Sequence, residues 1–349
     1  MEKVLMKGNE AIAEAAIRAN CKHFFGYPIT PQTEISAYMS KRMPKVGGTF
    51  MQAESEVAAI NMVYGAVGAG VRAMTSSSSP GISLKAEGLS YIAGADLPCV
   101  IVNIVRAGPG LGGIQPAQSD YFQAVKGGGH GDYRMIVIAP SSIQEIVDCT
   151  ISAFDLADKY RMPVMLMGDG MLGQMMEPVS FPETVVGSVI EKPWATTGTK
   201  MKRKANVINS LYIQPDELEQ IIIKRQHKYA EIEQNEVKFE AEGLEDAEIV
   251  LVAYATTARI AKAAISQAKK EGFKVGIIRP ITLWPFPNSI IEKTAARVKC
   301  MITVEMSTGQ MVEDVRLAVN GACPVYFYGR TGGNVPTPAA LLEQIRRYV

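Results

Sequence analysis

Short, continuous apolar runs alternate with segments of helical periodicity over residues 1–180. The apolar runs predict strands at 23–27, 73–77, 98–106, 135–139 and 163–167. The periodic segments predict helices at 10–19, 56–67 and 143–157, the last of them after a Pro-Ser-Ser start. Strands that are apolar throughout are typical of a parallel sheet with helices on both faces. We therefore expect an open, mostly parallel α/β domain over residues 1–182.

The pattern changes after residue 182. Residues 183–244 predict a linker or insert containing one long helix that starts near Pro215. A single stripe of that helix carries Leu218, Ile221, Ile222, Tyr229 and Ile232. From residue 245 the alternation resumes, with strands predicted at 248–254, 275–278, 300–305 and 325–328 and helices at 258–270, 310–319 and 338–348. A proline-punctuated loop is predicted at 283–287. This predicts a second open, mostly parallel-sheet domain over 245–349.

Composition narrows the functional class. The chain is 47% hydrophobic and 20% charged, which excludes an intrinsically disordered protein. Its net charge of +1 gives no overall electrostatic attraction to nucleic acid. The basic residues at 200–204 are interpreted as part of a solvated or subunit-facing linker, because no aromatic residue interleaves them. We expect no membrane partner and a cytoplasmic protein, because the chain has no apolar run long enough to span a bilayer and begins without a signal-peptide pattern.

Known metal and nucleotide motifs are missing. The five cysteines contain no C-x-x-C pair, so we expect neither a zinc site nor an iron–sulfur cluster held by this chain. The glycine-rich stretch 108–113 contains a proline and lacks the G-x-G-x-x-G register, and the chain has no P-loop. Gly-Asp-Gly at 168–170 resembles the start of a diphosphate and magnesium motif, but the expected paired asparagines do not follow. We interpret it as a strand-end turn and expect no metal ligand.

Polar residues follow predicted parallel strands, where such sheets place their chemistry. Thr30 lies in a tight turn and could instead cap the helix that follows. Glu56 opens an apolar helix, where an acidic residue also suits the helix dipole. Arg106 ends the most apolar strand, and a guanidinium there needs a carboxylate, a phosphate or a protein partner. The hydroxyl-rich run 75–81 suits an anion or a polar ligand.

Five segments of the sequence resemble a known family. They are GYPITP, QAESEVAAINMVYGA, TSSSSPGISLKAEG, LPCVIVNIVRAGPGLGGIQPAQSD and RPITLWPFP. In this order they are similar to the alpha subunits of 2-oxoacid:ferredoxin oxidoreductases, most of all the branched-chain type that acts on 3-methyl-2-oxobutanoate. The resemblance covers about residues 1–180 and 245–349. It implies a thiamine diphosphate pyrimidine-binding domain followed by a transketolase C-terminal-like domain.

The resemblance also implies an activity and an assembly. The expected reaction is oxidative decarboxylation of a branched-chain 2-oxoacid to acyl-CoA and CO2, with coenzyme A as co-substrate and reduction of ferredoxin. A beta subunit would bind the cofactor diphosphate and Mg²⁺, and gamma and ferredoxin-like delta subunits would complete a complex whose iron–sulfur clusters lie only in partner subunits. The alternatives are a 2-oxoglutarate or pyruvate enzyme, or a non-catalytic scaffold subunit with a degenerate thiamine domain.

The resemblance assigns roles to individual residues. Glu56 would hydrogen-bond the pyrimidine ring nitrogen of thiamine diphosphate, although Glu54 competes for this role. Arg106 would receive the substrate carboxylate, and Thr30 would lie near the substrate and the aminopyrimidine. The residues expected to contact the cofactor are Glu56, Pro28, Ile29, Thr30, Ser77, Ser78, Pro80 and Gly81.

Overall fold

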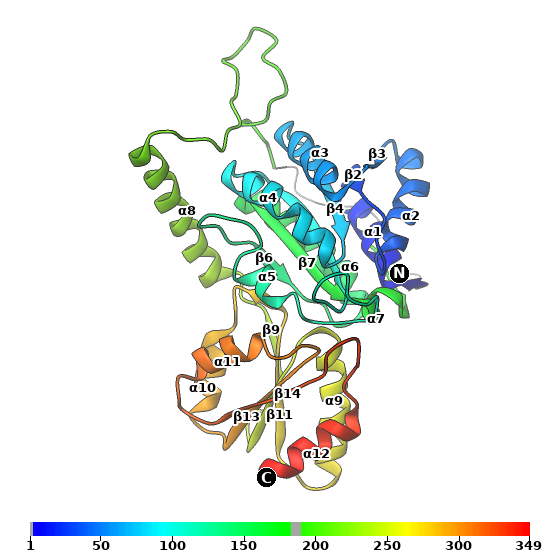
Figure 1. The fold of residues 1–349 in the computed structure, drawn as a ribbon, viewed down its shortest axis with the longest axis vertical. Helices are drawn as coiled ribbons and strands as arrows, with labels where there is room; N and C mark the ends of the chain where they lie inside the picture. Colours follow the sequence, from blue (N-terminus) through cyan, green and yellow to red (C-terminus); the bar gives the residue numbers. More distant parts are fainter. Residues whose placement is uncertain (1–2, 183–189) are drawn as a thin grey trace.

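The computed structural model describes residues 3–182 and 190–349 and contains two α/β domains stacked along the long axis of the molecule (Figure 1). The first domain is built on a seven-stranded sheet. In spatial order its strands are β12 (Thr282–Trp284), β6 (Ile136–Ile138), β7 (Pro163–Asp169), β5 (Cys99–Val105), β4 (Ala73–Ser77), β2 (His23–Gly26) and β3 (Thr49–Gln52). All neighbours pair in parallel except β12, which pairs antiparallel with β6.

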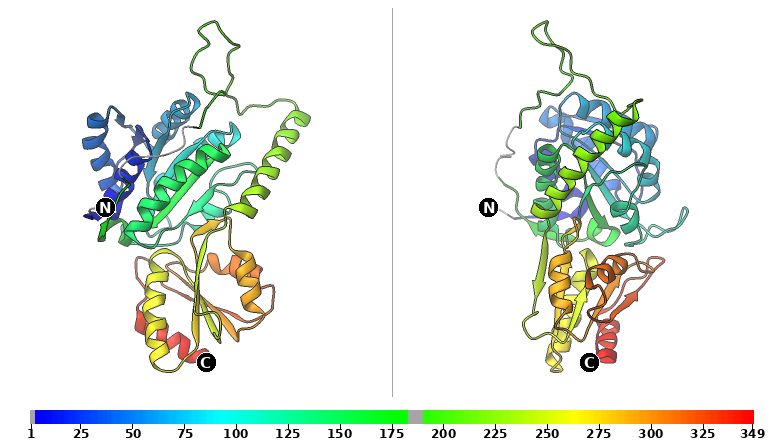
Figure 2. Two further views of the ribbon diagram at one scale, coloured as in Figure 1. Left: turned by 180° about the vertical axis from the view of Figure 1, so that it is seen from behind. Right: turned by 90° about the vertical axis from the view of Figure 1, so that its left-hand side faces the viewer.

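Helices cover both faces of this sheet, with α4 in front in Figure 1 and α6 in front when the molecule is seen from behind (Figure 2). Because strands β4, β5 and β7 are buried along their whole length, they need this double cover. The helices of the domain are α1 (Gly8–Arg18), α2 (Thr33–Arg42), α3 (Glu56–Gly68), α4 (Pro80–Gly94), α5 (Tyr121–Val125), α6 (Ile143–Tyr160) and α7 (Gly170–Gln174), with a 3-10 turn at Met43–Val46. A small antiparallel pair, β1 (Val4–Lys7) and β8 (Met176–Val179), lies at its margin.

The second domain has a five-stranded sheet. Its strands, in spatial order, are β14 (Val325–Gly329), β13 (Cys300–Glu305), β10 (Ile249–Val252), β11 (Val275–Pro280) and β9 (Phe239–Glu242). Only β9 is antiparallel to its neighbour. Its helices are α9 (Ala255–Lys270), α10 (Asn288–Ala295), α11 (Met311–Val319) and α12 (Pro338–Tyr348). The fold is therefore the predicted one, with two open and mostly parallel sheets.

Residues 190–214 form an irregular loop that projects from the end of the molecule opposite the second domain (Figure 1). It leads into α8 (Pro215–Asn235), which starts where the sequence predicts. Only the second half of its predicted apolar stripe is buried, through Tyr229 and Ile232, whereas Leu218 is exposed. Leu218 is exposed because the helix extends past the domain at its first turn, as Figure 2 shows. None of the helices in the described residues is both long and apolar enough to cross a bilayer.

Five strands were not predicted: β1, β3, β8, β9 and β12. β12 comes from the segment that the prolines mark as a loop, and it pairs back onto β6 of the first domain. β9 lies in the segment 183–244 and joins the second sheet at its edge. β3, β9 and β12 are edge strands, and β1 and β8 pair only with each other. The hydrogen bonds that such strands make with another part of the chain define them more than their own sequence does.

Candidate functional site

Four loops meet at the carboxyl end of the first sheet, and they carry the residues that the sequence singles out. Thr30 follows β2, Glu56 follows β3, Ser78 to Gly81 follow β4, and Arg106 follows β5. Because β3, β2, β4 and β5 are parallel neighbours, their carboxyl ends form one edge. We call this group of loops the polar edge.

Glu56 is the first residue of α3, and its side chain is only 6% exposed. The helix is capped one residue earlier, where the Ser55 hydroxyl accepts a hydrogen bond from the Ala58 amide at 3.1 Å. Within the described ranges no group donates a hydrogen bond to the Glu56 carboxyl, which leaves it available to a ligand. Glu54, two residues earlier, is exposed. Burial thus separates the two candidate carboxyls.

Gly81 brings α4 against this carboxyl. A Cβ at that position would lie 2.6 Å from Glu56 Oε1 and 2.0 Å from Ser77 Oγ, closer than any side chain tolerates. The hydroxyls of Thr75, Ser77 and Ser78 are buried and have no hydrogen-bond partner within the described residues. Unpartnered buried hydroxyls beside a buried carboxyl are a fitting environment for a polar ring system, because such groups need partners when they leave water.

Arg106 is buried and ties two loops of the polar edge together. Its guanidinium donates to the Thr30 carbonyl at 2.9 Å and to the Leu111 carbonyl at 3.2 Å, while its Nε has no partner among the described residues. The backbone of Arg106 exchanges hydrogen bonds with the Ser79 hydroxyl at 3.0 and 3.1 Å. Ser79 has a φ of 24°, and strained backbone conformations of this kind cluster at functional sites.

Hydrogen bonds of the Gln32 side chain hold the turn that carries Thr30. The Gln32 amide donates to the Tyr27 carbonyl at 3.1 Å, and its oxygen accepts the Ser76 hydroxyl at 2.6 Å. Thr30 does not cap α2, since that helix begins at Thr33 and the capping position belongs to Gln32. Thr30 is therefore an exposed side chain on a rigid turn, and the capping interpretation is wrong.

Lys85 is a residue of this site that the sequence analysis missed. It lies one helical turn after Gly81 on α4 and is 0% exposed, with no hydrogen-bond partner for its ammonium group in the described part of the chain. Burial lowers the pKa of Lys85 to about 8, and the nearby charge of Glu56 opposes this shift. A lone lysine within the otherwise apolar and small-residue face of a helix was the signal available in the sequence.

Asp169 ends β7 and caps the short helix α7, as expected for a strand-end turn. Its Oδ1 accepts the amides of Met171 at 2.9 Å and Leu172 at 3.2 Å, and burial raises the pKa of this carboxyl. Residues 3–182 and 190–349 contain no group of three or more His, Cys, Asp or Glu side chains that could hold a metal ion. The cysteines are all free, and Cys21, Cys99 and Cys300 are buried.

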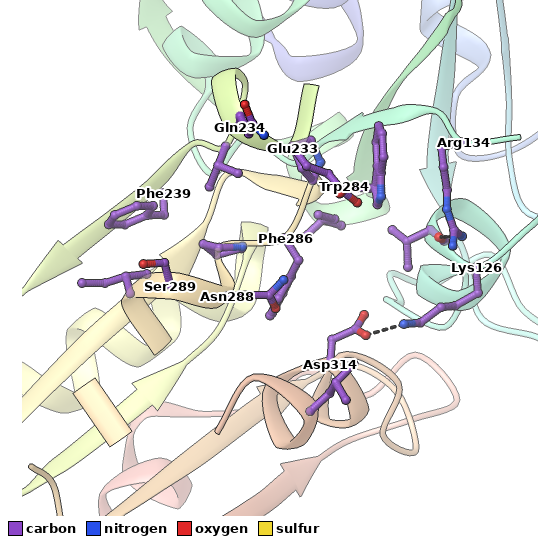
Figure 3. A pocket seen from close by; sticks show the side chains of 17 residues that line it. Lys126, Arg134, Glu233, Gln234, Phe239, Trp284, Phe286, Asn288, Ser289 and Asp314 are labelled. Atoms are coloured by element: carbon purple, nitrogen blue, oxygen red, sulfur yellow. Dashed lines mark hydrogen bonds and ion pairs between the residues drawn. The ribbon is translucent and has the colours of Figure 1, made fainter. Parts of the chain in front are cut away.

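Two cavities lie at the boundary between the domains. One, of about 780 Å³, has Thr30 in its wall and so adjoins the polar edge. The other, of about 490 Å³, lies between α8, α10 and α11, where Lys126 pairs with Asp314 (Figure 3). No residue of the polar edge lines this second cavity.

The fold and the polar edge define a class of protein. A family model described as "Pyruvate flavodoxin/ferredoxin oxidoreductase, thiamine diP-bdg" matches residues 14–243, and "Pyruvate:ferredoxin oxidoreductase core domain II" matches residues 247–341. The chain therefore belongs to the 2-oxoacid:ferredoxin oxidoreductases, a family of oxidoreductases, and carries their thiamine diphosphate-binding domain.

Relatives place it more closely within that family. The chain is 52% identical to the ketoisovalerate oxidoreductase subunit VorB of Methanothermobacter marburgensis, over 99% of this chain and 98% of that protein. It is 35% identical to the 2-oxoglutarate synthase subunit KorA of Methanocaldococcus jannaschii, over 98% of each. Relatives of this kind are named as subunits, so the family forms assemblies of several chains.

Solved structures agree with the fold. A 2-oxoglutarate:ferredoxin oxidoreductase from Magnetococcus marinus, with 2-oxoglutarate, coenzyme A and succinyl-CoA bound, matches with a TM-score of 0.89 and 27% identity. The match covers 99% of this chain and 65% of that one. A split-gene transketolase matches with a TM-score of 0.60 at 12% identity, which is a likeness of fold alone.

Proposed function

We propose that this chain is the subunit of a 3-methyl-2-oxobutanoate (ketoisovalerate):ferredoxin oxidoreductase that binds the pyrimidine half of thiamine diphosphate. The assembly converts the 2-oxoacid and coenzyme A to an acyl-CoA and CO2, and the electron pair released passes to ferredoxin. The observation that carries the proposal is the buried Glu56 carboxyl, which has no protein donor and lies against Gly81 on the polar edge. The 52% identity to a ketoisovalerate oxidoreductase subunit supports the substrate.

Each residue has a part in this proposal. Glu56 holds a proton at the pyrimidine ring nitrogen, in a position where burial strengthens the hydrogen bond. Ser77, Ser78 and Gly81 line the ring, together with the 28–30 turn. When bound, thiamine diphosphate would supply the electron sink for loss of the carboxyl group as CO2. Arg106 and Thr30 orient the substrate carboxylate through charge-assisted hydrogen bonds.

The remaining components belong to partner subunits. A beta subunit binds the diphosphate and Mg²⁺, and gamma and ferredoxin-like delta subunits carry the iron–sulfur clusters and pass electrons to ferredoxin. We place the assembly in the cytoplasm, in keeping with five free cysteines. Residues 1–182 and 245–349 are the two functional domains, and the segment between them connects them.

One experiment tests the proposal against its alternatives. The complex is purified with its partner subunits and assayed with coenzyme A, a viologen dye and a panel of 2-oxoacids. We expect the highest kcat/KM with 3-methyl-2-oxobutanoate. Highest kcat/KM with 2-oxoglutarate or pyruvate would overturn the substrate assignment. Absence of both thiamine diphosphate binding and 2-oxoacid turnover would identify a scaffold subunit with a degenerate thiamine domain.

A further inference from the structure

The cavity of about 780 Å³ beside Thr30 is built from both domains. The first domain contributes Ile114 from the loop after β5, Met171 from α7, and Met175, which directly follows α7. The second domain contributes Val335 from the loop before α12. None of the residues that line it is charged. It is therefore an apolar cavity with a few neutral polar groups, the usual character of a site for a small molecule.

The cavity is joined to the polar edge through Arg106. The guanidinium of Arg106 bonds the Thr30 carbonyl at 2.9 Å, and its backbone bridges to Pro116. Thr30 and Pro116 both line the cavity. A 2-oxoacid whose carboxylate lies at Arg106 and Thr30 therefore has this cavity available for its side chain.

The second domain forms part of the cavity wall through a contact that only glycine permits. Gly333 has a φ of 94°, and a Cβ there would lie 2.4 Å from Cβ of Gln115. Val335, two residues further along the same loop, also lines the cavity. The loop of one domain thus helps to shape a cavity that begins in the other.

The lining distinguishes between substrates. The residues that line the cavity offer no cation to the second carboxylate of 2-oxoglutarate, and an apolar wall does not replace the hydration that a carboxylate loses on contact. The methyl group of pyruvate would leave most of the apolar wall without contacts. A branched aliphatic group makes contacts with the wall and needs no polar partner, and methionine side chains adapt to its shape.

We propose that this cavity binds the aliphatic side chain of the 2-oxoacid and that Ile114, Met171 and Val335 determine the preference for branched substrates. The inference rests on the proposed function, because it takes the carboxylate to lie at Arg106 and Thr30. The competing occupant of the cavity is the pantetheine arm of coenzyme A.

The test uses the assembled complex and steady-state kinetics with three 2-oxoacids and with coenzyme A. Met171→Trp fills the cavity, so kcat/KM for 3-methyl-2-oxobutanoate should fall about tenfold or more while that for pyruvate changes much less, in keeping with apolar pocket discrimination. Met171→Arg supplies a cation, so 2-oxoglutarate should gain relative to 3-methyl-2-oxobutanoate. Calorimetry with the unreactive analogue 3-methylbutanoate should show weaker binding to both variants. Met201→Trp is the matched control, because Met201 is 98% exposed.

The outcomes are separable. The inference would be overturned if kcat/KM fell equally for all 2-oxoacids. It would also be overturned if the KM for coenzyme A rose while the selectivity among 2-oxoacids stayed unchanged. If Met171→Trp does not assemble, Ile114→Trp replaces it, since Ile114 lies on a loop and is 57% exposed. The unmodified complex is measured first, and its failure to convert any 2-oxoacid would refute the proposed function itself rather than the cavity assignment.

Discussion

Lys85 and Glu56 are two buried ionisable residues at one end of the α3–α4 helix pair. The ammonium group of Lys85 has no hydrogen-bond partner within the described residues, and the charge of Glu56 lies near it. Natural cores rarely leave such groups unpaired, because each loses its hydration without replacing it. Their presence together supports the proposal that a ligand or a partner completes this site. The same reasoning makes Lys85 a cost to the stability of the chain alone.

Replacing Lys85 with methionine should stabilise the chain in a pH-dependent way. The pKa of Lys85 is lowered from 10.5 to about 8 by burial, so the unfolded chain binds the proton more tightly than the folded chain. The penalty is complete below about pH 8 and is relieved as the pH rises toward 10.5. At about 1.4 kcal/mol per pKa unit, Lys85→Met should gain up to about 3 kcal/mol at pH 7.

Thermal and denaturant unfolding of the chain at a series of pH values would measure this gain. The control is Lys270→Met, because Lys270 lies exposed near the end of α9. A gain that stays constant from pH 7 to beyond the unfolded pKa would show that Lys85 acts through packing and not through its charge.

The assignment of the catalytic carboxyl is also testable by single substitutions. In the assembled complex, Glu56→Gln should lower kcat by about 10²–10⁴-fold, because an amide cannot hold the acidic proton at the pyrimidine nitrogen. Glu54→Gln should retain nearly full activity, since Glu54 is exposed. The reverse pattern would move the catalytic role to Glu54. Circular dichroism of both variants checks that the fold is retained.

At the scale of elements, the sequence predicts best where a segment's own pattern decides its structure. β4 coincides with its predicted bounds, and α6 begins after a Ser142 hydroxyl that accepts the Glu145 amide at 3.2 Å. β12 and β9 were missed because pairing with a distant strand makes each of them. The same limit applies to the site: Thr30, Glu56 and Arg106 stand out in the sequence, but Met171 and Val335 meet only through the packing of the domains.

Arg279, on β11, is one of the residues that connect the two domains. It is 2% exposed and makes two hydrogen bonds to Glu145 of α6, at 2.8 and 3.0 Å, and one to Glu240 of β9 at 2.6 Å. Arg279→Met should lower the free energy of unfolding by about 2 kcal/mol. Both carboxylates are partly exposed, so the effect lies below that of a fully buried pair.

Equilibrium denaturation would measure the effect of Arg279→Met, and Arg346→Met is its control. Arg346 also makes two hydrogen bonds to one carboxylate, that of Glu271, but both groups are well exposed. Such exposed pairs contribute little to stability, because solvent screens their charges. If the free energy of unfolding fell equally in the two variants, the burial of Arg279 would add nothing to the stability of the contact between the domains.

At the scale of the whole molecule, the polar edge is flanked by apolar side chains that the chain itself does not cover. Met51 on β3, Val57 on α3 and Leu84 on α4 are all substantially exposed. Exposed apolar residues around a buried, unpartnered carboxyl are typical of a surface that a second chain covers. This arrangement agrees with a cofactor site shared between subunits, with this chain supplying only its pyrimidine side.

It follows that the chain alone should bind thiamine diphosphate poorly and should not turn over any 2-oxoacid. Half of a shared site provides few of the contacts that the cofactor needs, and the described residues offer no cluster of ligands for Mg²⁺. Calorimetric titration with thiamine diphosphate and Mg²⁺ should detect no saturable binding at micromolar cofactor, and addition of the beta subunit should restore it. The complex carrying Glu56→Gln should bind the cofactor more weakly than the unmodified complex. Tight binding and turnover by this chain alone would contradict the shared site, because one polypeptide would then hold both halves of the cofactor.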